Sequence, residues 1–145
     1  MVDDQTSRQT DGTPSADLVD LPAALDRVAQ KLSRMTPREL SRRIPGRDGL
    51  PQRRVDVARA LAERLAVVVQ GVEHAHLADP PAWRRLPYER DGVVGFQLRV
   101  LAHDLAGFLP HAPAQIWTPA GRRPLADVLA ELAADLERLE MFLPG

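Results

Sequence analysis

Leucines at the end of the chain recur at a spacing that only a helix places on one side. They are Leu125, Leu129, Leu132, Leu136, Leu139 and Leu143, separated by 4, 3, 4, 3 and 4 residues. Because an α-helix completes a turn in about 3.6 residues, they form one apolar stripe, and the acidic residues between them fall on other faces. The pattern predicts a helix from about Pro124 to about Leu143, buried along one face.

Similar stripes predict further helices earlier in the chain. We expect one that begins near Asp17 or Asp20, a short one over about 37–43, and two long ones over about 51–77 and 92–109. Thr36, Pro37 and Glu39 form the start signal of the short helix, a capping box with a first-turn proline. The two long helices are apolar on more than one side, which predicts deep burial. Gly71 inside the first of them is expected where a neighbouring helix approaches closely.

No segment alternates convincingly as a strand does, and residues 116–118 are expected to be extended at most. We therefore predict an all-α fold, an up-down four-helix bundle with one additional short helix over residues 16–145. Residues 1–15 are polar and show no periodicity, which predicts a disordered N-terminal tail. In this bundle the helices over 51–77 and 92–109 would pair antiparallel.

Composition narrows the classes of function. The 145 residues include no cysteine, which excludes disulfides, thiolate zinc sites and a cysteine nucleophile. No apolar run is long enough to span a membrane, and the N-terminus lacks the apolar core of a signal peptide. We expect a cytoplasmic protein without a membrane partner.

The net charge of −1 is unevenly distributed. Residues 21–54 hold nine basic and three acidic side chains, a local charge of +6, whereas residues 1–20 hold five Asp and one Arg. Clustered cations are the residues that bind phosphates. The candidate basic patch is Arg34, Arg38, Arg42, Arg43, Arg47, Arg53 and Arg54. Few aromatic residues interleave with it, so a solvated or ion-paired face is the favoured interpretation. An acidic protein partner and nucleic-acid binding are the less favoured ones.

Polar residues close to apolar stripes are the candidates for a ligand site. They are Glu73, His74, Gln97, His103 and Asp104. Asp104 falls near the buried stripe of its helix, where a carboxylate should be paired or hydrogen-bonded. Antiparallel pairing would separate His103 from His74 by a long distance along the helix axis, which disfavours a shared metal ion. We therefore predict no metal and no cofactor.

Common catalytic motifs are absent: the chain has no GxSxG, GxxxxGK[ST], HExxH or dinucleotide glycine pattern. A four-helix layout with a histidine near the end of the second long helix is similar to DinB-like metal-dependent transferases. That family also needs histidines on its last helix, and residues 122–145 contain none. We do not assign the chain to it, and an enzyme is less expected than a non-enzymatic protein.

Three functional hypotheses follow. The first is a non-enzymatic bundle that acts through self-association or a protein partner, since apolar helix surface is in surplus. The second is a bundle that binds a small ligand or a metal, which includes an enzyme without a common motif. The third is nucleic-acid binding through the basic residues within 27–54.

Overall fold

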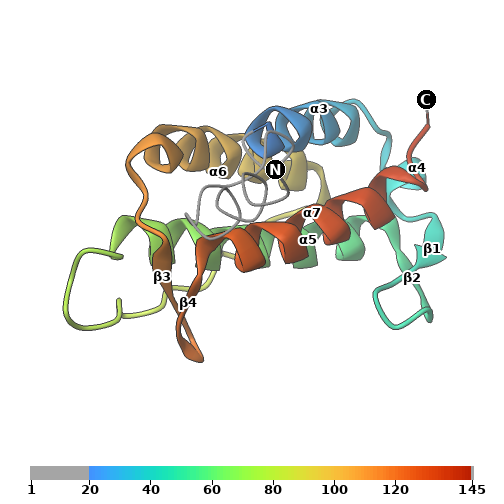
Figure 1. The fold of residues 1–145 in the computed structure, drawn as a ribbon. Helices are drawn as coiled ribbons and strands as arrows, with labels where there is room; N and C mark the ends of the chain where they lie inside the picture. Colours follow the sequence, from blue (N-terminus) through green and yellow to red (C-terminus); the bar gives the residue numbers. More distant parts are fainter. Residues whose placement is uncertain (1–19, 145) are drawn as a thin grey trace, which may run out of the picture.

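The computed structural model describes residues 20–144, and the expected tail over 1–15 lies outside them. The helices are α3 (Leu21–Ser33), α4 (Pro37–Leu40), α5 (Arg54–Glu73), α6 (Val94–Phe108) and α7 (Leu125–Glu140), with 3-10 turns η1 (Asp91–Val93) and η2 (Leu109–His111). The strands are β1 (Arg43–Pro45), β2 (Pro51–Arg53), β3 (Gln115–Thr118) and β4 (Gly121–Pro124). Helices α3 and α6 lie above α5 and α7 in Figure 1. None of the described helices is long and apolar enough to cross a membrane.

The prediction of an all-α fold is wrong, because two antiparallel hairpins accompany the helices. Strand β1 pairs with β2, and β3 pairs with β4. Each strand is only three or four residues long, and in each hairpin one residue alone, Ile44 or Ile116, is buried in the core. Strands this short carry too few alternating residues to produce a period-two signal.

The up-down arrangement is also wrong, because α5 and α6 run parallel. Asp91, just before α6, lies 3.1 Å from Arg53 and 3.3 Å from Arg59 at the start of α5. The chain must therefore return along the whole of α5 through the crossover segment 74–90 before α6 begins. Helix α6 instead pairs antiparallel with α3, where Asp26 contacts Arg99 at 3.2 Å.

Gly71 is needed for a close approach, but the neighbour is a strand rather than a helix. A Cβ atom at this position would lie 2.0 Å from the carbonyl oxygen of Trp117 in β3. The close helix–helix approach occurs elsewhere, at Gly95 of α6, where a Cβ would meet the carbonyl oxygen of Ala29 at 2.7 Å. The backbone of the second hairpin therefore lies directly on α5.

The start of α4 follows the predicted capping box. The hydroxyl of Thr36 accepts a hydrogen bond from the backbone N–H of Glu39, whose carboxylate accepts one from the N–H of Thr36. This second bond lowers the pKa of Glu39 below its ordinary value. Asp20, by contrast, precedes α3 without a side-chain capping bond.

Arg54 is a buried cation that joins three helices. Its two terminal nitrogens donate to the carbonyl oxygens of Glu39 in α4, at 2.9 Å, and of Phe142 just beyond α7, at 2.8 Å. Both carbonyls lie at helix C-termini, where the helix dipole favours a positive charge. The first residue of α5 is thus fixed to the far end of the chain.

Candidate functional site

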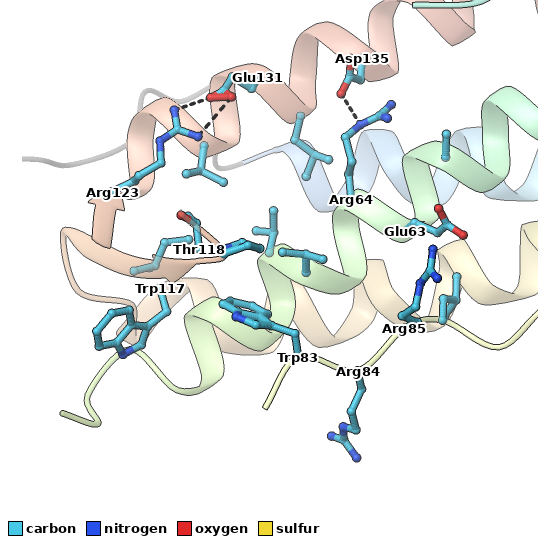
Figure 2. Close-up of a pocket in the computed structure, with 18 of the residues that line it drawn as sticks. Glu63, Arg64, Trp83, Arg84, Arg85, Trp117, Thr118, Arg123, Glu131 and Asp135 are labelled. Carbon is cyan, nitrogen blue, oxygen red and sulfur yellow. Dashed lines mark hydrogen bonds and ion pairs between the residues drawn. The ribbon is translucent and has the colours of Figure 1, made fainter. Parts of the chain in front are cut away.

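A pocket of about 460 Å³ opens between α5, α7, the second hairpin and the crossover segment. Its apolar walls include Val67 and Val68 of α5, Ile116 of β3, and Val128 and Leu132 of α7. Trp83, Leu86 and Trp117 also line it. Figure 2 shows charged side chains from α5, α7, the crossover segment and the second hairpin around it. Its volume and mixed chemistry are typical of small-molecule sites.

Gln70 holds the crossover segment against the pocket. Its side-chain amide donates to the carbonyl oxygen of Arg84 at 3.0 Å and accepts from the N–H of Arg84 at 2.8 Å. The same amide donates to Ala66, one turn earlier in α5. The buried glutamine thus satisfies both backbone hydrogen-bonding groups of Arg84, as a neighbouring strand would. It thereby fixes the pocket wall that carries Trp83.

The second hairpin closes the pocket and also caps α5. Arg122 donates to the carbonyl oxygens of Ala75 at 2.6 Å and Leu77 at 2.8 Å, and its guanidinium stacks over the ring of Trp117. Trp117 Nε1 donates to Leu77 as well, at 3.1 Å. Successive strand side chains point to opposite faces, so the next residue, Arg123, turns toward the pocket.

Arg123 forms a bidentate ion pair with Glu131 at the pocket rim. The two nitrogen–oxygen distances are 2.5 and 3.2 Å. The hydrogen bond from Arg123 lowers the pKa of Glu131 and raises that of the guanidinium. Both side chains are largely solvent-accessible, so the pair orients the hairpin more than it stabilises the fold.

Asp135 is the most buried charge of the pocket, with 3% of its side chain exposed. Arg64 Nε lies 2.6 Å from Oδ2, and Arg47 Nε lies 3.7 Å from Oδ1. Arg138 contacts Oδ1 from one turn further along α7. Three guanidinium groups therefore surround one carboxylate, contributed by the first hairpin, α5 and α7.

A second hollow, of about 350 Å³, adjoins the pocket toward the first hairpin. Arg47, Ala60 and Arg64 line both spaces, so together they form one groove along α5. The far part is lined by Asp48, Gln52 and Val57. Arg47 and Arg64 consequently lie at the middle of the groove rather than at its end.

None of the five predicted ligand-site residues lines this groove. Glu73, His103 and Asp104 are exposed, which corrects the expected burial of Asp104. His74 ends α5 and contacts the carbonyl oxygen of Gln70, and Gln97 donates to the carbonyl oxygen of Pro87. They were chosen because they lie close to apolar stripes, and the antiparallel pairing that was used to compare the heights of His74 and His103 is wrong. In the described residues, no three His, Asp or Glu side chains converge as metal ligands would.

The predicted basic patch does not form one surface. Arg54 is buried, Arg53 is paired with Asp56 and Asp91, and Arg47 reaches the groove. The remaining arginines of the set, Arg34, Arg38, Arg42 and Arg43, are exposed. The basic residues of this stretch therefore lie in different settings: buried in the core, paired with carboxylates, lining the groove or exposed. The number of charges does not distinguish these settings.

Sequence reasoning missed the groove residues Arg64 and Asp135, and also Gln70, which holds the crossover segment that forms one wall. The sequence did offer one signal for Asp135. It directly precedes Leu136 of the leucine stripe and lies three residues after Leu132, so an α-helix places this charge beside the buried leucines.

Fold and site together define a helical bundle with two hairpins and an amphipathic groove. The chain matches no protein-family model, no curated protein and no solved structure. The functional assignment therefore rests on the groove itself.

Proposed function

We propose that this protein binds a small molecule with an apolar body in the pocket between α5, α7 and the second hairpin. The observation that carries the proposal is the pocket, whose wall is mostly apolar yet holds the buried Asp135 and its arginines. Burying charges beside an open apolar hollow costs stability and needs a compensating role. Ligand binding supplies that role, without any catalytic group.

The supporting elements are rigidly held. Gln70 fixes one wall by reciprocal hydrogen bonds, and Arg122 with Trp117 fixes another. A wall held in place before binding loses little conformational entropy when a ligand arrives. The pocket is therefore suited to a small rigid molecule rather than to a flexible peptide.

Binding of N-phenyl-1-naphthylamine, an uncharged dye that fluoresces in apolar surroundings, tests the proposal. We expect saturable binding of one dye per chain. Val67→Trp fills the pocket and should weaken binding by about tenfold or more, because the filled space removes the dye's contacts. Ala130→Trp, on an exposed position of α7 outside the pocket, is the matched control and should bind as the wild type does. Absence of binding, or equal effects of both variants, would refute the proposal.

Self-association is the second candidate, and one observation favours it. Phe96 and Val100, one turn apart on α6, are 65% and 44% exposed instead of buried. The two side chains form an apolar strip on the outer face of α6, where a second copy would cover them. The surplus of apolar helix surface that favours self-association therefore lies on α6.

Sedimentation velocity over a range of protein concentrations tests self-association. A wild-type dimer should dissociate in Phe96→Glu, with its dissociation constant raised by about tenfold or more, since a charge replaces a central apolar contact. Met141→Glu changes an exposed apolar residue beyond α7 and should leave the dimer intact. A wild-type monomer at all concentrations would remove this candidate.

A further inference from the structure

We infer that Arg47 and Arg64 form an anion subsite in the middle of the groove, with Asp135 as its internal counterion. The ligand is then an amphipathic molecule with an apolar body and one carboxylate, sulfonate or phosphate head. This inference rests on the proposed small-molecule function and specifies its ligand class.

Hydrogen-bond donors exceed acceptors around Asp135. Each guanidinium carries five N–H donors, and a carboxylate offers about four acceptor positions. Arg64, Arg47 and Arg138 all lie within ion-pair distance of this one carboxylate. The local charge is +2, and most of the donors find no acceptor on Asp135. A second anion would satisfy them.

The guanidinium of Arg64 is only partly engaged by Asp135. Its ion pair with Asp135 uses Nε, drawn as the dashed line in Figure 2, and its two terminal nitrogens extend away from that carboxylate. Nε itself is buried and, although it lies 2.6 Å from Asp135, it has no hydrogen-bond partner of good geometry within residues 20–144. Arg47 is 60% exposed at its side chain and contacts Asp135 only at 3.7 Å, so it is able to reorient toward a ligand.

The other arginines of the pocket are less suitable. Arg123 is occupied by Glu131 in a bidentate pair. Arg84 points away from the other labelled residues in Figure 2, whereas Arg85 points toward Glu63. Arg138 contacts Asp135 but does not line the pocket. Arg47 and Arg64 remain as the pair of cations that an anion in the groove would meet.

The apolar part of the subsite's ligand has a defined place. Val67 and Val68 follow Arg64 by three and four residues on α5, so they lie on the same side of the helix one turn away. Both line the larger pocket together with Leu132. The head and the body of an amphipathic ligand would therefore be separated by about one helical turn, on the order of 5 Å.

Two naphthalene dyes that differ only by one sulfonate group provide a direct test. They are 1-anilinonaphthalene-8-sulfonate and its uncharged parent, N-phenyl-1-naphthylamine. Arg47→Gln should weaken binding of the sulfonate about tenfold, the loss expected for one charge-assisted hydrogen bond, and weaken binding of the uncharged dye much less. Added salt should weaken only the sulfonate. Arg38→Gln, which removes an exposed arginine of α4, is the matched control and should change neither dye.

Asp135→Asn provides a second test with the opposite sign. Removing the internal counterion should tighten sulfonate binding several-fold, with a smaller change in the binding of the uncharged dye. If this variant does not fold, which circular dichroism reveals, Arg47→Gln still decides the question, because Arg47 is mostly exposed. Equal effects on both dyes, or no effect on the sulfonate, would overturn the subsite and leave the proposed function standing. Failure of the wild type to bind either dye would overturn both.

Discussion

Replacing Gly71 by alanine should destabilise the protein by about 3 kcal/mol, even though alanine is the better helix former by about 1 kcal/mol. The new Cβ would lie 2.0 Å from the carbonyl oxygen of Trp117, a backbone atom of β3 that no change of side-chain rotamer can move. The hairpin must shift off α5, which strains the bonds of Arg122 and Trp117 to the end of that helix. Denaturation by guanidinium, followed by circular dichroism, measures the loss.

Gly107→Ala is the matched control for this prediction. Gly107 also lies in a helix, α6, but a Cβ there would meet nothing within 4 Å. Its replacement should be neutral or stabilise the fold by up to about 1 kcal/mol. If Gly71→Ala were as stable as Gly107→Ala, the close contact described between α5 and the second hairpin would be contradicted. Gly71→Ala should also bind the uncharged dye poorly, because the displaced hairpin carries one wall of the pocket.

Arg54→Met should cost about 3 kcal/mol of unfolding free energy. Methionine retains much of the apolar packing of the side chain but leaves the carbonyl oxygens of Glu39 and Phe142 without their donor. Removal of a buried cation recovers some desolvation energy, so the loss is smaller than that of two full charge-assisted hydrogen bonds. Thermal and guanidinium unfolding of the variant measure it.

Arg53→Met is the matched control for Arg54→Met, because Arg53 is the neighbouring arginine but is not buried. Arg53 is partly exposed and pairs with Asp56 and Asp91. Partly exposed ion pairs contribute little, so we expect a loss of about 1 kcal/mol or less. A larger loss for Arg53→Met than for Arg54→Met would contradict the role assigned to the buried arginine.

The helices were predictable from sequence because their signals are local. The leucine stripe places α7 within a few residues of its observed ends, and the capping box of Thr36 and Glu39 forms as expected. The hairpins were missed because each buries one isoleucine and, apart from Trp117, their strands consist of arginine, proline, glycine and polar residues. Their positions are set by contacts with α5 rather than by their own periodicity.

The site was not predictable because it depends on contacts between elements that lie far apart in the sequence. A crossover of 74–90 allows α5 and α6 to run either antiparallel or parallel, and residue spacing does not distinguish the two. The ion pairs of Asp91 show the parallel direction, and Asp104 is exposed. Arg64 and Asp135 meet only because α5 and α7 pack together, and their sequence separation hides this contact.

Nuclear magnetic resonance of the full chain, labelled with nitrogen-15 and titrated with 1-anilinonaphthalene-8-sulfonate, tests the central claim most directly. The chain has two tryptophans, Trp83 and Trp117, and both line the pocket. We predict that both indole signals and the backbone signals around Arg64 shift together and saturate at one dye per chain. Unmoved indole signals, with shifts centred instead on Phe96 and Val100 of α6, would contradict the account.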